Sequence, residues 1–181
     1  MGPNGVALFS ASQSNNYSSA TFSNLVKNSN GTADPALSRD AIQFTRALGL
    51  THKDPNNLVR PVNLDILIVP PSLEDAAERM IFSEGIYGSP NREINPLKNK
   101  IKILVWPRLE TRSDATDTSK YWFMADSSKV KDTLQAIFAK KPSLDPPEVI
   151  YASKSWEWSL FYYYVVGLGL QDAIFGSRGT A

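Results

Sequence analysis

Side chains that could carry catalysis are scarce in this sequence of 181 residues. It contains no cysteine and a single histidine, His52. The composition therefore excludes disulfides, thiolate nucleophiles, cysteine-based zinc sites and metal sites that need several histidines. A serine hydrolase would have to build its triad on His52, but no nucleophile motif accompanies that residue. We expect His52 to be a surface residue or a cation near a helix end, and we predict no catalytic residue, metal or cofactor.

Two other groupings could suggest chemistry. Glu74, Asp75 and Glu78 could form a general acid/base pair, but they fall at the start of an expected helix. Carboxylates there offset the positive end of the helix dipole, so we interpret them as helix-stabilising. Gly167 and Gly169 lack a third glycine at the dinucleotide-binding spacing, because position 172 is aspartate. We therefore predict no small-molecule substrate.

Charge and hydropathy narrow the class of protein further. Lys and Arg number 19 and Asp and Glu 18, which does not indicate a dedicated nucleic-acid binder. No run of about 18 apolar residues is present, so we expect no membrane partner. Lys98, Lys100 and Lys102 form a basic stripe along an expected strand. We interpret it as a solvated face that protects a sheet edge, with a neighbouring subunit or DNA as the alternative contact.

The first 33 residues differ from the rest in composition. From Ser10 to Thr32 the sequence is rich in Ser and Asn and carries one charge, Lys27. Such a segment cannot bury enough apolar surface to fold alone. We expect an extended arm or loop that is ordered by contacts elsewhere in the protein or assembly, with a disordered terminus as the alternative.

Two helices are expected in the first half of the chain. The first covers 35–48, with Asp34 as its N-cap and Gly49 as its terminator. Its apolar spacing predicts an inner face of Leu37, Ala41, Phe44 and Leu48. The second follows the buried strand 64–69, and its expected inner face is Leu73, Ala76, Ala77, Met80 and Ile81. Ser72 and Asp75 have the spacing of a capping box at its start, and the residues expected to close it are Gly85 and Gly88.

Strands dominate the second half. We predict strands over 100–105 and 121–124, and surface loops over 84–99 and 110–120. The periodicity of 130–140 fits a helix or a strand, and we expect Pro142 to break the chain after it. An aromatic strand over 156–166 has apolar residues on both faces, which predicts that it is covered on both sides. Its Trp and Tyr residues could instead form a stacking platform for sugar or single-stranded nucleic acid, although aromatic strands are more often core or interface.

Five short motifs in this order resemble the major head subunits of tailed bacteriophages. They are the stretches LIVPPSLEDAA (67–77), NPL (95–97), PRL (107–109), WFMAD (122–126) and the stretch from Phe161 to Gly167 followed by Asp172. The motif positions are Pro70, Pro71, Asn95, Pro96, Pro107, Arg108, Trp122, Gly167 and Asp172. The chain departs from the family pattern in lacking its N-terminal histidine and in carrying Ile174 where an arginine is usual.

This resemblance implies a Hong-Kong-97-type α+β fold with axial and peripheral domains. Residues 1–33 would be an arm or loop, 34–63 the spine-helix region and connector, 64–150 the axial domain, and 151–181 the return strand of the peripheral domain. It also implies a strand over 133–138. The match suggests the C-terminal portion of such a subunit, with the N-terminal arm and extended loop incomplete.

The implied function is that of a major capsid protein. Copies would form hexamers and pentamers of an icosahedral shell around double-stranded DNA, in a virion assembled in the bacterial host cytoplasm. Decoration or scaffold proteins and non-specific DNA contacts are possible partners. The alternatives are an encapsulin-type shell protein, a carbohydrate-binding module that uses the aromatic strand and, least favoured, a small hydrolase.

Overall fold

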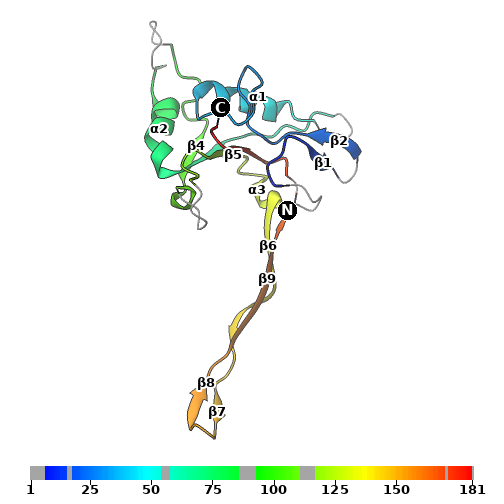
Figure 1. Cartoon of the computed structure of the whole chain (residues 1–181), viewed down its shortest axis with the longest axis vertical. Coiled ribbons are helices and arrows are strands. Elements are labelled where there is room, and N and C mark those ends of the chain that lie inside the picture. The colour runs from blue at the N-terminus through cyan, green and yellow to red at the C-terminus, as the bar shows by residue number, and fades with distance from the viewer. Residues whose placement is uncertain are drawn as a thin grey trace.

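The computed structural model describes residues 7–15, 18–53, 58–85, 93–110, 117–169 and 171–180. Figure 1 shows a body of helices and strands from which a long, narrow hairpin extends. Both helices and strands are present, so the α+β prediction is confirmed. The body contains the hydrophobic core, and the hairpin lies largely outside it.

A four-stranded sheet with the order β10-β5-β3-β4 organises the body. Strand β3 (Ile66–Val69) is parallel to β4 (Lys102–Val105), while β5 (Trp122–Ala125) runs antiparallel to β3 and to β10 (Ile174–Ser177). The strands expected over 64–69, 100–105 and 121–124 are thus confirmed, with slightly different ends. Of the three lysines in the expected stripe, only Lys102 lies in the edge strand β4, while Lys98 and Lys100 lie in the turn before it and Lys98 forms an ion pair with Glu84 at 3.2 Å.

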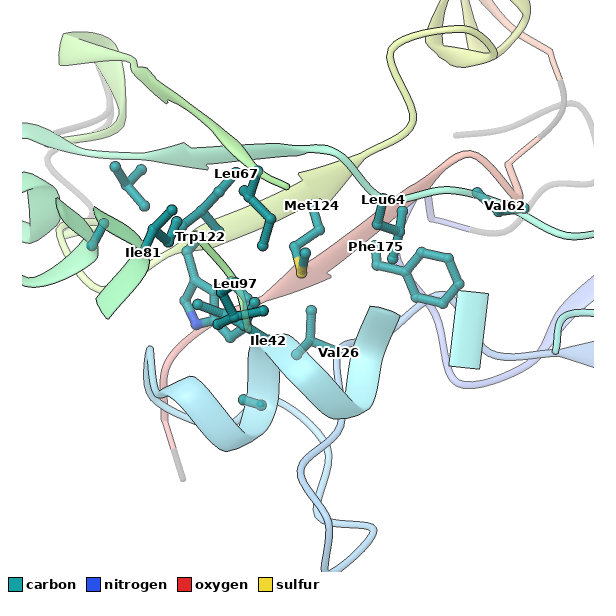
Figure 2. Packing of buried hydrophobic residues seen from close by; sticks show 14 residues of the cluster. Val26, Ile42, Val62, Leu64, Leu67, Ile81, Leu97, Trp122, Met124 and Phe175 are labelled. Atoms are coloured by element: carbon teal, nitrogen blue, oxygen red, sulfur yellow. The ribbon is translucent and has the colours of Figure 1, made fainter. Parts of the chain in front are cut away.

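Helix α1 (Arg39–Leu50) packs beside the sheet and supplies part of the core shown in Figure 2. The predictions of its N-cap, of its terminator and of its buried face were wrong. Its N-cap is Ser38, whose hydroxyl accepts a hydrogen bond from the Ala41 amide at 3.2 Å, whereas Asp34 lies outside the helix. Gly49 lies within the helix and does not end it, because Thr51 is the C-cap. The buried face is correspondingly shifted and consists of Ala41, Ile42, Thr45 and Gly49.

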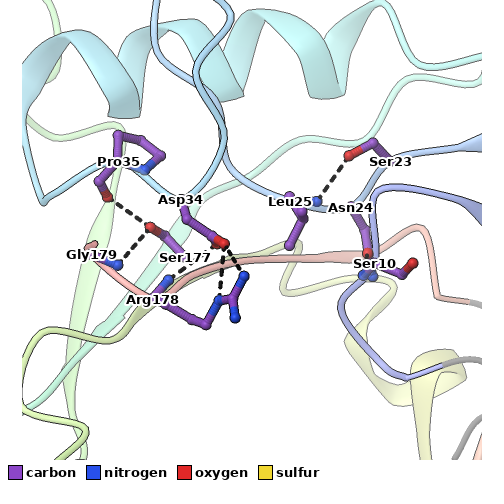
Figure 3. A network of polar contacts seen from close by, with 9 residues as sticks. All are labelled: Ser10, Ser23, Asn24, Leu25, Asp34, Pro35, Ser177, Arg178 and Gly179. Carbon is purple, nitrogen blue, oxygen red and sulfur yellow. Dashed lines mark hydrogen bonds and ion pairs between the residues drawn. The ribbon is translucent and has the colours of Figure 1, made fainter. Parts of the chain in front are cut away.

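The Asp34 side chain contacts Arg178, which lies near the other end of the sequence. Its carboxylate accepts hydrogen bonds from Arg178 Nε at 2.9 Å and Nη2 at 2.7 Å (Figure 3). Beside it, the Ser177 hydroxyl donates to the Pro35 carbonyl at 2.7 Å. The same carbonyl accepts from the buried indole of Trp122 at 3.1 Å. These bonds fix the residues before α1 against β5 and β10.

Helix α2 (Glu74–Phe82) follows β3 through the short 3₁₀ helix η1 (Pro71–Leu73). The expected capping box is absent, because the Ser72 hydroxyl donates to the Ser119 carbonyl at 3.0 Å and no side chain caps α2. The carboxylates of Glu74 and Asp75 do lie in its first turn, as predicted. The helix ends at Phe82, before Gly85, while Gly88 lies outside the described residues.

The segment before α1 packs against the body. Strands β1 (Gln13–Asn15) and β2 (Ser18–Phe22) form an antiparallel hairpin. Phe9 stacks on Phe123 of the sheet at 5.1 Å between ring centroids, and Leu25 forms a bridge with Gly176 at the β10 edge. The described part of 1–33 therefore contacts the body of the same chain, and its assignment as an arm or loop stays a prediction.

The long hairpin is built from the region of ambiguous periodicity and the aromatic stretch. A helical turn, α3 (Val130–Thr133), leads into β6 (Leu134–Leu144), which pairs with β9 (Leu160–Leu168). Farther out, β7 (Glu148–Ile150) pairs with β8 (Ser155–Glu157). The strand over 133–138 is confirmed in essence. The break expected at Pro142 was wrong, because β6 continues to Leu144 with register shifts on either side of Lys140.

Candidate assembly surface

The hairpin leaves the sheet between two adjacent strands. It follows β5 and precedes β10, and Ala125 and Ile174 are paired where it begins and ends. Its base is closed by pairing of Leu134 with Leu168 and by a hydrogen bond from the Gly169 amide to the Thr133 carbonyl at 2.8 Å. The hairpin is therefore anchored between the inner strand β5 and the edge strand β10.

Asp126 organises the turn between β5 and α3. Its carboxylate accepts from the Asn63 amide at 2.9 Å and from the Ser128 hydroxyl at 2.6 Å. Burial opposes ionisation of this carboxyl, but the hydrogen bonds from Ser128 and Asn63 outweigh it and leave its pKa below the ordinary value. An ionised Asp126 thus holds the start of the hairpin against the residues before β3.

One side of the hairpin, which we call the aromatic face, carries mainly aromatic and aliphatic residues. Residues directly opposite each other in an antiparallel pair share a face, so Phe138 and Tyr164 lie together. Their ring centroids are 5.7 Å apart, and Tyr162 stacks on Tyr164 at 5.8 Å. The residues of this face are Leu134, Ala136, Phe138, Leu144, Leu160, Tyr162, Tyr164, Val166 and Leu168.

The opposite side, the mixed face, combines apolar and polar groups. Ile137 is paired with Val165, and Lys140 with Tyr163. The Lys140 ammonium lies 5.4 Å from the ring centroid of Phe161, within the range of a cation–π interaction. Both faces of the hairpin therefore present large apolar side chains.

The expectation that the aromatic strand is covered on both sides was wrong for the single chain. Tyr162, Tyr163 and Tyr164 are 51%, 64% and 55% exposed, and Trp156 and Trp158 are 61% and 57% exposed. The reason is that β9 pairs with β6 in a projecting two-stranded ribbon, over which no other described element folds. Apolar residues on both faces of a strand indicate that both faces are buried in the functional state. They do not indicate whether the same chain or another molecule buries them.

The outer end of the hairpin has a feature that the sequence did not reveal. Glu148 and Glu157 are directly opposite each other in the β7–β8 pair. Like charges at opposite positions destabilise a sheet, so this pair weakens the isolated hairpin. The sequence contains both residues, but their pairing depends on a register that cannot be read from periodicity.

The family-motif residues lie mainly in the body and serve its architecture. Pro70 and Pro71 end β3, and Pro107 and Arg108 form the 3₁₀ helix η2 (Pro107–Leu109) after β4. Buried Trp122 lies in β5.

Asn95 terminates α2, donating from its side-chain amide to the carbonyls of Met80, Ile81 and Ser83 at 2.8, 3.2 and 3.2 Å. Exposed Pro96 follows it in a turn.

The last two motif residues flank the return from the hairpin to the sheet. Gly167 lies in β9, where a Cβ would meet no atom within 4 Å. Asp172 is buried and forms an ion pair with Arg60 at 3.1 Å. The structure does not gather the motif residues into one site. The two surface loops expected over 84–99 and 110–120 are also our candidates for contacts between subunits, and residues 86–92 and 111–116 of these loops lie outside the described residues.

His52 is half-buried and follows the end of α1, where a surface residue or a cation was expected. It packs edge-on against Phe22, with ring centroids 5.2 Å apart. Burial lowers the pKa of His52, the charge of Asp172 opposes this shift, and the charges of Arg60 and Lys129 reinforce it. Hence the neutral imidazole is favoured.

The described body and hairpin thus form a structural unit with a prominent apolar surface. The family model described as "Phage capsid protein" matches residues 4–176, and the chain belongs to this family. Its role is therefore that of a structural protein of a phage capsid. A comparison with curated proteins finds no match. No helix in the described part of the chain is long and apolar enough to cross a membrane.

Proposed function

We propose that the chain is a subunit of a Hong-Kong-97-type shell and that copies assemble through the hairpin into an icosahedral head around double-stranded DNA. The observation that carries this proposal is the exposure of large apolar residues on both faces of the hairpin. Capsid subunits of the matched family act in assemblies of many copies, which would provide the missing cover.

The energetics of the hairpin support this proposal. A lone two-stranded hairpin is marginally stable in water, and extensive exposed apolar surface marks an interaction site. The hairpin carries exposed aromatic and aliphatic residues along its full length, from Leu134 to Val166. Packing against neighbouring subunits would bury both faces and stabilise the strand pairing at the same time.

The finer organisation belongs to the same proposal. Residues 34–63 and 151–181 would contribute to a peripheral domain and 64–150 to an axial domain, in hexamers and pentamers. The near-neutral chain would hold DNA by enclosure, with non-specific contacts, and assembly would take place in the bacterial cytoplasm. Scaffold or decoration proteins would be additional partners.

The exposed aromatic residues also support a second candidate, a carbohydrate-binding module. Tyr162 and Tyr164 stack with an interplanar angle of 23°, a geometry that could accept a sugar ring. An encapsulin-type shell would assemble in the same way as a phage head and would differ in its cargo.

Light scattering with negative-stain microscopy of the purified chain tests the proposal. Concentration-dependent rings, shells or large particles are expected. A persistent monomer whose tryptophan fluorescence is quenched by oligosaccharides would refute the capsid assembly and support the carbohydrate-binding module. Particles that retain phage DNA rather than a protein cargo would distinguish a head from an encapsulin.

A further inference from the structure

A pocket of about 650 Å³ opens between the start of α1 and the side of α2. Its lining includes two arginines, Arg39 from α1 and Arg79 from α2, together with the apolar side chain of Met80. The pocket is thus positively charged at one part and apolar at another. A pocket of this character fits an anionic group that is attached to an apolar surface.

The arginines in this pocket lack acidic partners within the described residues. No ion pair joins Arg39 or Arg79 to a carboxylate in that part of the chain. The Arg39 Nε atom is buried and has no hydrogen-bond acceptor. Leaving a buried donor unsatisfied is costly, so an acceptor that entered the pocket and bonded the half-exposed Arg39 guanidinium would offset this cost, while Arg79 is exposed and open to a second acceptor.

The tip of the hairpin carries two acidic side chains that lack a basic partner among the described residues. Glu148 and Glu157 are directly opposite each other, and Ile150 lies on the same side of the ribbon, two residues along. Side chains at opposite positions have Cβ atoms about 5 Å apart, so the two carboxylates repel each other unless a cation lies between or beside them. Two guanidinium groups in a pocket with an apolar wall match two carboxylates beside an isoleucine.

We propose that the Arg39–Arg79 pocket of one copy binds the Glu148–Glu157 tip of a second copy. This inference rests on the proposed assembly function and names the contact that orders it. Figure 1 shows the tip at the far end of the hairpin, away from α1 and α2 of the same chain. The carboxylates therefore reach such a pocket on another copy and not on their own.

The contact joins different surfaces of the two partners, so it is heterologous. Heterologous contacts generate rings when the rotation between neighbours closes, and open chains when it does not. Each subunit would give its tip to one neighbour and receive a tip from the other. Arg39 and Arg79 form bidentate bonds with carboxylates when the geometry is planar, which would fix the angle between neighbours.

Charge reversal tests this contact in both directions. The variant E148K/E157K has a basic tip and a basic pocket, and the variant R39E/R79E has an acidic tip and an acidic pocket. Each variant alone is expected to lose assembly, with at least a hundredfold rise in the concentration needed for oligomers. An equimolar mixture restores both pairings, because each tip then meets an oppositely charged pocket on the other variant.

The mixture makes a further, sharper prediction. Subunits must alternate around a ring, so rings with an even number of subunits form and rings of five do not. Native mass spectrometry and microscopy count the subunits. The control K53E/K131E carries the same charge change as R39E/R79E but lies outside the pocket, and it is expected to assemble like the unmodified chain.

The outcomes separate this inference from the proposed function. If the unmodified chain stays monomeric at every concentration, the assembly function fails and the contact fails with it. If the unmodified chain assembles but the reversed variants assemble equally well, or their mixture is not restored, the contact alone is refuted. Normal assembly of R39E/R79E with loss of DNA binding would assign the pocket to phosphate and overturn the inference.

Discussion

Replacing Tyr162 and Tyr164 by serine should abolish assembly while the body remains folded. A buried aromatic side chain removes about 150–250 Å² from water. These two side chains are 51% and 55% exposed, so an interface could bury roughly 80 Å² of further apolar surface on each. At about 25 cal/mol per Å², the loss is about 2 kcal/mol per ring and about 4 kcal/mol for each contact. That corresponds to roughly a thousandfold weaker association.

Sedimentation velocity over a range of concentrations measures this effect, and circular dichroism follows the melting of the body. Melting of the body should change little, because the two rings lie outside the core. A matched control replaces Leu50 and Val59 by serine. These residues are 49% and 63% exposed but belong to the body. Unchanged assembly of the tyrosine variant, or an equal loss in the control, would refute the assignment of the aromatic face.

Three further predictions concern the body. Gly49→Ala should destabilise the chain by about 1–3 kcal/mol, because the new Cβ would lie 2.7 Å from the Val62 carbonyl oxygen; Gly167→Ala, which has open space, is the control in the same thermal unfolding experiment. Asn95→Leu should cost about 1–3 kcal/mol in urea unfolding because it leaves carbonyls at the end of α2 without their donor, and an unchanged midpoint would contradict that role. The pKa of His52 is lowered in the folded chain, so the unfolded chain binds a proton more readily. The free energy of unfolding should therefore fall as the pH drops below about 6.5. The variant His52→Gln should show a weaker dependence of the melting temperature on pH between about pH 7.5 and pH 5.

Local sequence patterns predicted the strands of the body well. Where the local patterns gave a wrong prediction, as for the N-cap of α1, a long-range contact explains the difference. Apolar runs ended by Pro70 and Pro107 identify β3 and β4, because proline cannot continue a sheet ladder. Asp34 has the chemistry of an N-cap, but Arg178 binds its carboxylate from 144 positions away in the sequence. Ser38 then caps α1, four residues later than expected. No local rule can foresee such competition for a side chain.

The candidate site was predictable in composition but not in geometry. The aromatic stretch was recognised as a surface that must be covered, yet its partner strand and its projection from the body could not be deduced. The register of the hairpin decides which residues Lys140, Glu148 and Glu157 face on the opposite strand. Register shifts on either side of Lys140 change this pairing along the hairpin. The unsatisfied Arg39 likewise depends on how α1 packs beside α2.

The way in which the hairpin joins the sheet has a consequence for how such a subunit can diversify. Because Ala125 and Ile174 face each other in neighbouring strands, the 48 residues between them form an insertion whose two ends nearly coincide. Residues can be added to or removed from such an insertion with little change in the cost of closing it, and without displacing β5 or β10. The length of the hairpin can therefore change without a change in the stability of the body. Hairpins of different length would place neighbouring subunits closer together or farther apart while the sheet remains the same.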